Sequence, residues 1–152
     1  RPEDRSRLWN ARHNMFYSVQ RMRPGSVGWP TDVCVPISRL ADCINQTLED
    51  LSQTSLLAPL VGHVGDGNFH LQYLIDPDNE EELAQARWVN GRMIERAIEM
   101  GGTCTGEHGV GHGKIKYLER EHGAPSLAVM AAIKRALDPE NIMNPGKILS
   151  IN

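Results

Sequence analysis

The distribution of glycine constrains this chain more than any other feature of its sequence. Nine of its fourteen glycines lie in two short stretches, residues 62–67 and 101–113. Four of the six histidines lie within or beside these stretches, namely His63, His70, His108 and His112. Glycine allows the backbone to approach other groups closely and to adopt positive φ, and histidine titrates near neutral pH and binds metals. Two loops that combine these residue types predict one site assembled from both.

The rest of the composition is that of an ordinary globular domain. The 152 residues fit a single domain, and 40% hydrophobic with 23% charged residues argues against disorder. The net charge of −3, with lysine and arginine scattered along the chain, gives no support for nucleic-acid binding. No apolar run reaches the roughly 18 residues of a membrane span, and no signal peptide opens the chain. Three cysteines without a CxxC pair favour a reducing compartment over a disulfide framework.

Hydrophobic spacing predicts alternating helices and strands. It also predicts apolar faces on the last two helices, formed by Leu83, Ala86, Val89, Met93, Ala97 and Met100 in the first of them and by Leu127, Met130, Ile133 and Leu137 in the second. Ser38 is expected to cap the second helix, and Asp78 with Glu81 has the spacing of a capping box for the third. Together the elements predict an α+β fold with a small antiparallel sheet covered by helices. We expect helices at about residues 2–20, 38–51, 78–100 and 126–138, and strands at about residues 31–37, 58–64 and 69–75.

The segment HVGDGNFH, residues 63–70, gives the strongest chemical signal. Asp66-Gly67 between two β-rich runs is a favoured two-residue hairpin turn. With that turn His63 pairs with His70, and their Cβ atoms lie roughly 5 Å apart. A wider loop would break this register, but the odd separation of the two histidines still favours a shared face. Two such imidazoles can bind one metal ion; the alternative is a pair of histidines hydrogen-bonded within a turn.

The second glycine-rich stretch, GGTCTGEHGVGHGK, presents Glu107 and His108 between glycines. A carboxylate with two histidines forms a three-ligand site with an open position, as is typical of a catalytic ion. His108 would then stay free of the metal and act as a general base. One alternative is a surface Glu-His pair on a flexible loop. Another is a phosphate-binding loop, although the segment lacks the spacing of the known phosphate-binding motifs.

Four segments in order, TDVCVPISRL, HVGDGNFH, GTCTGEHGVGHGK and DPENIMNPGKIL, resemble the C-terminal domain of the FAD-linked oxidase family. This family includes D-lactate dehydrogenases, glycolate oxidase flavoprotein subunits and D-2-hydroxyglutarate dehydrogenases, which are similar to the vanillyl-alcohol-oxidase flavoenzymes. The resemblance extends from Leu8 to Leu149. It implies that residues 1–152 are a truncated, ferredoxin-like C-terminal cap domain that binds substrate. It also leads us to expect that this chain lacks the N-terminal domain that binds FAD in this family.

The resemblance also implies roles for individual residues. His108 matches the proposed base, which takes the hydroxyl proton of the substrate while a hydride passes to FAD. Arg12 matches an arginine that binds the substrate carboxylate, and Asn144 matches a position near the isoalloxazine ring. Without the resemblance, Arg12 would be interpreted as an exposed helix charge and Asn144 as part of a turn. The implied ligands of a divalent ion, zinc or manganese, are His63, His70 and Glu107.

Departures from the family pattern narrow the expected substrate. Relatives that oxidise 2-hydroxyglutarate carry a lysine just before the aspartate matched by Asp32, whereas Pro30 and Thr31 precede it here. Phe16 places an apolar wall where those relatives have a small hydroxyl residue. Such a wall disfavours a second charge, which would lose its solvation without gaining a partner. We therefore expect a small monocarboxylic acid such as D-lactate, with glycolate or another D-2-hydroxy acid as the alternative.

Two other classes of function stay open. A stand-alone metal-dependent hydrolase would use the same ion to activate water, and a non-catalytic module would form a homodimer through open sheet edges. Neither explains why Arg12 and Phe16 accompany the metal-site motifs, so an FAD-dependent D-2-hydroxy acid dehydrogenase, inactive as this fragment alone, is preferred. Its expected partners are the hydroxy acid and the flavin domain of the same protein. The expected location is the cytoplasm, peripherally on a membrane, or the mitochondrion in a eukaryote.

Overall fold

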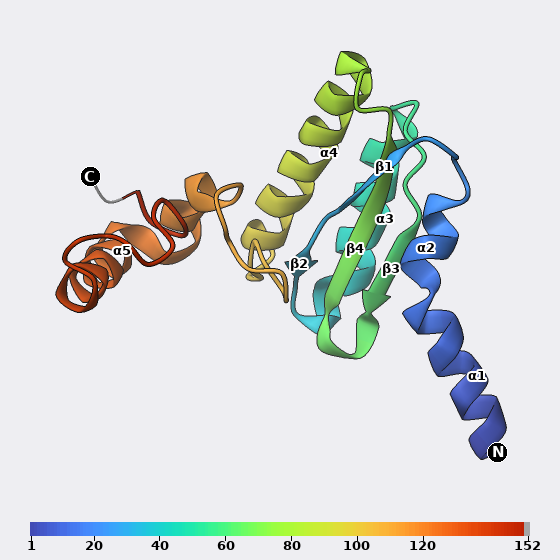
Figure 1. Ribbon diagram of the computed structural model, residues 1–152, viewed down its shortest axis with the longest axis horizontal. Coiled ribbons are helices and arrows are strands. Elements are labelled where there is room, and N and C mark those ends of the chain that lie inside the picture. The colour runs from blue at the N-terminus through green and yellow to red at the C-terminus, as the bar shows by residue number, and fades with distance from the viewer. Residues whose placement is uncertain (151–152) are drawn as a thin grey trace.

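The computed structural model describes residues 1–150, so the last two residues of the expected domain range 1–152 lie outside the described residues. Helices and strands alternate along the chain (Figure 1), which confirms the predicted α+β class. The elements are α1 (Pro2–His13), α2 (Met15–Gln20), β1 (Val27–Pro30), β2 (Val33–Cys34), α3 (Ile37–Ser52), β3 (Leu60–His63), β4 (Asn68–Ile75), α4 (Glu80–Glu99) and α5 (Leu118–Leu137).

The sheet is small and antiparallel, as predicted, with β4 at its centre. β1 and β2 pair with successive parts of one edge of β4, and β3 pairs with the other edge. Every residue of β4 is buried. Because β4 has neighbours on both edges and packed groups on both faces, it is the most firmly held part of the molecule.

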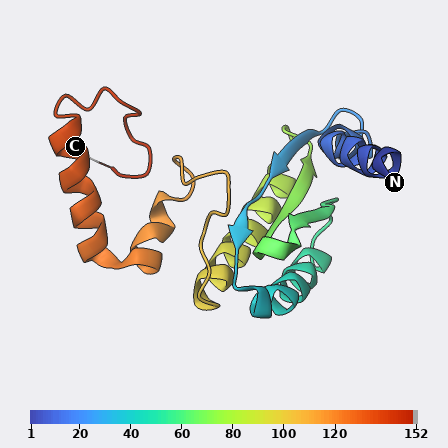
Figure 2. The same ribbon diagram turned by 90° about the horizontal axis from the view of Figure 1, so that it is seen from below.

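Helices α3 and α4 cover one face of the sheet, and α1 and α2 lie on the other side (Figure 2). The predicted apolar face of α4 is confirmed at Ala86, Val89, Met93 and Ala97, which are fully buried. These side chains recur at the spacing of one helix face and pack against the odd-numbered residues of β4. Helix α1, in contrast, has no buried residue.

The ends of α3 and α4 differ from the predicted ones. α3 begins at Ile37 directly after Pro36, and no side chain caps it, so the cap expected at Ser38 is wrong. α4 is capped by Asn79, whose side chain accepts two backbone N–H groups of the first turn, instead of by Asp78. The backbone N–H of Asp78 instead donates to the side chain of Asp76, within the turn that follows β4.

The strand predicted over residues 31–37 is correct only at Val33–Cys34. The chain leaves the ladder around Asp32 and re-enters the sheet as β2, so β1 and β2 are separate pairings on one edge of β4. The strand β1, with sequence VGWP, was not predicted because glycine and proline are depleted in strands.

Helix α5 begins at Leu118, earlier than the predicted start near Ser126, and it is kinked at Gly123 (φ 77°, ψ 153°). Pro125 follows the kink, and proline cannot donate to the preceding turn. With residues 138–150, α5 forms an arm that projects from the body of the molecule (Figure 1). Its predicted apolar face is largely solvent-exposed, with Ile133 55% and Leu137 73% exposed. No helix within residues 1–150 has the length and apolar character needed to cross a membrane.

Candidate functional site

The β3–β4 hairpin carries the two histidines, but its turn is wider than predicted. Residues 64–67 connect the strands, and the ladder pairs His63 with Asn68 and Val61 with His70. The predicted two-residue turn, which would pair His63 with His70, is therefore wrong. Val64–Asp66 forms a 3₁₀ turn that ends in left-handed Gly67 (φ 79°), and this backbone needs four residues. The ladder still places both histidines on one face, with ring centroids 6.2 Å apart.

The tautomer of His70 is set by its neighbours. The side chain is buried, and its Nδ1 lies 2.7 Å from the carbonyl oxygen of Thr31. Because a carbonyl oxygen only accepts, Nδ1 carries the hydrogen and Nε2 of the neutral ring presents a lone pair. That Nε2 lies 3.0 Å from Oε1 of Glu107. Two acceptors this close require a proton or a cation between them.

Glu107 is the point at which the two loops meet. Its Oε1 lies 3.5 Å from Nε2 of His63, and one ligand atom each from His63, His70 and Glu107 fall within 4.8 Å of one another. The structure therefore brings the three predicted ligands together. Two imidazole nitrogens and a carboxylate oxygen are suitable donors for a divalent ion such as zinc or manganese. The lone pair of His70 facing this carboxylate fits such an ion.

His108 lies beside this cluster with a freer side chain. Its ring centroid is 5.3 Å from that of His70, and its Nε2 is 3.6 Å from Oε1 of Glu107. The His108 side chain is 54% exposed, whereas that of His70 is 8% exposed. Such a group can approach a bound molecule and exchange a proton with it.

Arg12, near the end of α1, reaches the cluster from the helix that lies on the same side of the sheet as the two histidines. Its Nη2 lies 2.9 Å from Nε2 of His63. Within residues 1–150, Arg12 has no ion-pair partner. Because no carboxylate of these residues pairs with it, its guanidinium group can bind an incoming carboxylate, for which its planar fork is well suited. His63 would exchange its contact with Arg12 for a bound ion.

These residues line one cavity of about 390 Å³. Its polar lining includes the three predicted ligands, Arg12 and His108, and Phe16, Met15, Pro30 and Val61 are among its apolar lining residues. The structure thus places the predicted Phe16 as an apolar wall of the cavity.

Sequence reasoning missed several lining residues, and Gln72 is the one among them with an unpaired polar group. Gln72 is 4% exposed, and its Nε2 has no hydrogen-bond partner among the described residues. The available signal was its position two residues after His70, because residues two apart on a strand share a face. An unpaired buried amide in a cavity wall offers a donor to a ligand.

Asp32 was also missed as a functional residue, although its buried carboxylate binds the loop that carries Glu107 and His108. Burial alone would raise its pKa, but hydrogen bonds lower the pKa to about 2. A lone acidic residue in an otherwise β-rich run was the available signal, because buried carboxylates need partners. The groups that donate hydrogen bonds to its carboxylate are the backbone N–H groups of Gly106, Glu107 and His108, the hydroxyl of Thr105 and the amide of Asn68.

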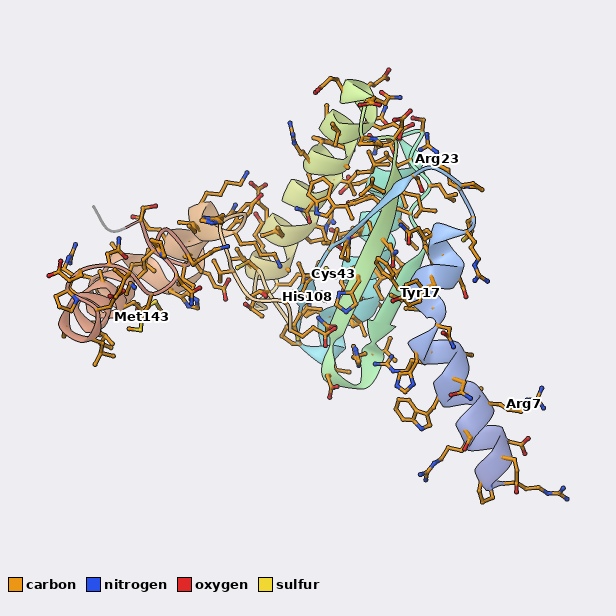
Figure 3. All side chains as sticks on the ribbon, in the orientation of Figure 1. Arg7, Tyr17, Arg23, Cys43, His108 and Met143 are labelled. Atoms are coloured by element: carbon orange, nitrogen blue, oxygen red, sulfur yellow. The ribbon has the colours of Figure 1, made fainter. Side chains whose placement is uncertain are left out.

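Asn144 is the one predicted site residue that the structure does not bring to the cavity. It is exposed, with φ 47°, in the segment that follows α5. Its neighbour Met143 lies in the projecting arm, well away from His108 (Figure 3). The arm returns to the glycine-rich loop only further on, where the N–H of Ile148 donates to the carbonyl of Gly111.

Comparison with known proteins identifies the family. The sequence profile of "FAD linked oxidases, C-terminal domain" matches residues 1–148. The chain is 48% identical over 149 residues to a probable mitochondrial D-lactate dehydrogenase of Danio rerio, covering 98% of this chain and 30% of that protein. It is 47% identical over 148 residues to a mitochondrial D-lactate dehydrogenase (cytochrome) of Arabidopsis thaliana, covering 97% and 26%.

A third relative is the glycolate oxidase subunit GlcD of Bacillus subtilis, at 34% identity over 148 residues, covering 97% of this chain and 31% of that protein. The chain thus spans less than a third of the length of each of these relatives. The match of the profile to residues 1–148 nevertheless includes every residue of the cavity. The chain therefore belongs to the family of FAD-linked oxidase C-terminal domains.

Proposed function

We propose that this chain is the substrate- and metal-binding part of an FAD-dependent D-2-hydroxy acid dehydrogenase that oxidises D-lactate to pyruvate. The observation that carries the proposal is the single cavity in which three metal-type ligands, a guanidinium group that pairs with no carboxylate of residues 1–150 and an exposed imidazole converge. A 2-hydroxy acid has a matching set of groups, because it combines a carboxylate with a neighbouring hydroxyl and a C–H bond.

Different residues of the cavity would bind different groups of the substrate. The guanidinium group of Arg12 binds the substrate carboxylate through two N–H donors. His63, His70 and Glu107 would hold the divalent ion, zinc or manganese. When bound, the ion supplies positive charge that favours ionisation of the 2-hydroxyl, and the flavin supplies the acceptor for the hydride.

His108 acts as the base. Its Nε2 takes the proton of the 2-hydroxyl, and its exposed side chain can later release that proton to water. His70 is unsuited to this role because its Nδ1 is bonded to a backbone carbonyl and the ring is buried. The burial of His70 therefore suits a metal ligand, and the exposure of His108 suits a base.

The apolar wall supports a small substrate. Phe16 is 39% exposed and lines the cavity, and it offers no partner for a second carboxylate. A methyl group, as in D-lactate, can pack against it without loss of solvation. Glycolate, which lacks this methyl group, is the alternative that the GlcD relative supports.

The proposal extends to the rest of the protein. Since the relatives are more than three times as long as this chain, we propose that another part of the protein binds most of the FAD. Asn144 keeps its proposed place near the flavin, on an arm whose exposed side chains would meet that part. Mitochondrial location is proposed from the names of the Danio and Arabidopsis relatives.

The test is anaerobic flavin reduction in the full-length protein. D-lactate should bleach the flavin absorption, and L-lactate and D-2-hydroxyglutarate should do so far more slowly. This chain alone, mixed with FAD, should not reduce a dye with D-lactate. Faster bleaching by glycolate than by D-lactate would favour the glycolate alternative.

A result without any flavin reduction would contradict the proposal. Ester or amide hydrolysis by the isolated chain would point instead to the hydrolase class. A stable dimer whose properties do not change when metal is removed would point to the assembly module.

A further inference from the structure

Glu107 and His108 lie in a segment without helix or strand, between Cys104 and Val110. At one end of this segment, Gly109 has positive φ and open space around it, so packing at that glycine does not hold the loop. Regular secondary structure therefore does not explain how the carboxylate of Glu107 is held within 3.0 Å of Nε2 of His70. A specific contact must fix the loop.

The contact is the carboxylate of Asp32, which is 2% exposed. Its Oδ2 accepts hydrogen bonds from three consecutive backbone N–H groups, those of Gly106 (2.8 Å), Glu107 (3.0 Å) and His108 (2.9 Å). The hydroxyl of Thr105 donates to the same oxygen at 2.9 Å. One oxygen thus fixes four successive residues, and charge-assisted hydrogen bonds of this kind are about twice as strong as neutral ones.

The second oxygen of Asp32 faces the hairpin. Oδ1 accepts from the amide of Asn68 at 2.8 Å, and it lies 3.7 Å from Nδ1 of His70. Asn68 is paired with His63 across the ladder. The two oxygens of one carboxylate therefore connect the loop that carries Glu107 with the hairpin that carries both histidines.

Gly106 makes this connection possible. A Cβ at this position would lie 2.0 Å from Nδ2 of Asn68 and 2.9 Å from Oδ1 of Asp32. Any side chain would push the loop away from the carboxylate. The charge of Asp32 is also supported, because Nζ of Lys114 lies 3.7 Å from Oδ2 and donates to the main-chain carbonyl of Asp32.

We infer that Asp32 is the positioning residue of the site, which fixes loop 105–108 against the β3–β4 hairpin so that Glu107 can share an ion with His63 and His70. The inference rests on the proposed metal site. Asp32 itself stays outside the ligand set, because both of its oxygens are occupied by donors of the chain.

Asp32→Asn tests this role with little change in shape. In either orientation the amide places an NH₂ group against donors, either the N–H groups of the loop or the amide of Asn68. The full-length protein, stripped with a chelator, would be titrated with Zn²⁺ against a chromophoric competitor. The expected result is a 10- to 100-fold weaker affinity, the usual effect of losing a contact behind a metal ligand. The visible absorption of bound Co²⁺ should change as well, because it reports ligand geometry.

Asp50→Asn is the matched control, since Asp50 is 3% exposed, paired with Arg96, and lies outside the cavity. This variant should lower the melting temperature but leave the Zn²⁺ affinity and the Co²⁺ spectrum unchanged. Gly106→Ala keeps every proposed ligand and the carboxylate of Asp32. It therefore tests the same contact if Asp32→Asn does not fold. It should also weaken Zn²⁺ binding.

The possible results distinguish failure of the positioning role of Asp32 from failure of the proposed metal site. Wild-type affinity and spectrum in Asp32→Asn, or in Gly106→Ala if the first variant does not fold, would overturn the positioning role alone. Equal loss of affinity in Asp32→Asn and Asp50→Asn would also overturn it, because general stability would then explain both. Failure of the unsubstituted protein to bind Zn²⁺, Mn²⁺ or Co²⁺ would contradict the metal site and this inference with it.

Discussion

The two halves of the site are held in place by different means. The β3–β4 hairpin places His63 and His70 through backbone pairing with a strand that is buried along its whole length. The glycine-rich loop places Glu107 and His108 through hydrogen bonds to a single carboxylate, that of Asp32. Many hydrogen bonds of the ladder thus share the task of placing the histidines, whereas a single residue places Glu107 and His108.

This difference has a consequence for variation in each half. A ladder tolerates the loss of one contact because its neighbours remain, whereas a loop fixed at one point moves as a unit when that point is lost. Ligands on the hairpin should therefore be sensitive to changes in register and turn. Groups on the loop should be sensitive to Asp32 and to the close approach of Gly106.

The largest expected effect concerns the hairpin half. His63→Ala removes a proposed ligand and should abolish uptake of the roughly one divalent ion per chain, measured by elemental analysis of the dialysed protein. His122→Ala is the control, because His122 lies outside the cavity and should leave the metal content unchanged. Equal metal content in the two variants would remove His63 from the ligand set.

The next effect distinguishes the role of His108 as a base from that of Glu107 as a metal ligand. His108→Ala in the full-length enzyme should slow flavin reduction by D-lactate by about 10²- to 10⁴-fold, the usual contribution of general acid–base catalysis. The metal should be retained, because His108 is assigned as the base and not as a ligand. Loss of metal together with rate would show that His108 and one of the ligands have exchanged roles.

Two glycines with similar φ allow a direct comparison of the packing in the two halves. Gly67 in the hairpin has φ 79°, and a Cβ there would lie 2.0 Å from the carbonyl oxygen of Val35; Gly109 in the loop has φ 78° with nothing within 4 Å. Gly67→Ala should therefore cost at least about 3 kcal/mol in free energy of unfolding, from steric overlap added to backbone strain. Gly109→Ala should cost about 1 kcal/mol, from strain alone. Urea denaturation measures both, and equal losses would contradict the difference in packing.

The last effect is a pH dependence that originates in the loop half and appears only in acid. Burial raises the pKa of Asp32, but its hydrogen bonds outweigh burial and lower it from 3.8 to about 2. A depressed pKa in the folded state contributes stability that is fully present above about pH 4 and is lost as the pH falls through 2. In the metal-free protein this contribution is about 2 kcal/mol. Unfolding curves between pH 5 and pH 2, compared with those of Asp32→Asn, would show it, and parallel pH profiles of the two proteins would rule it out.

Much of the fold could be predicted because its signals are local and periodic. The apolar positions of α4 recur at helical spacing, and the two runs around HVGDGNFH have β-strand composition, so both elements were identified from the sequence. The histidines share a face because side chains alternate along strands, and their odd separation keeps them together whenever the loop between the strands has an even number of residues, as residues 64–67 have.

The remainder depends on contacts between distant parts of the chain. The width of the hairpin turn is set by Gly67 packing against Val35, thirty-two residues earlier in the sequence. The role of Asp32 depends on donors more than seventy residues later, at Glu107 and its neighbours. The exposed apolar face of α5 shows the same limit, because helical spacing predicts a face but not what covers it.

In strand β4, odd-numbered residues contribute to the stability of the core, and the even-numbered residues from Asn68 to Gln72 contribute to the site. Phe69, Leu71, Tyr73 and Ile75 pack in the hydrophobic core, whereas Asn68, His70 and Gln72 face the site. Substitutions at the even-numbered positions of this group can therefore change what the protein binds without disturbing its core, which gives evolution a way to alter specificity in small steps. Deletion of a single residue from β4 would exchange the two sets and destroy both properties at once. In this strand, point substitutions are expected to accumulate between species at Gln72, which is neither a proposed ligand nor a partner of Asp32, while insertions and deletions are not.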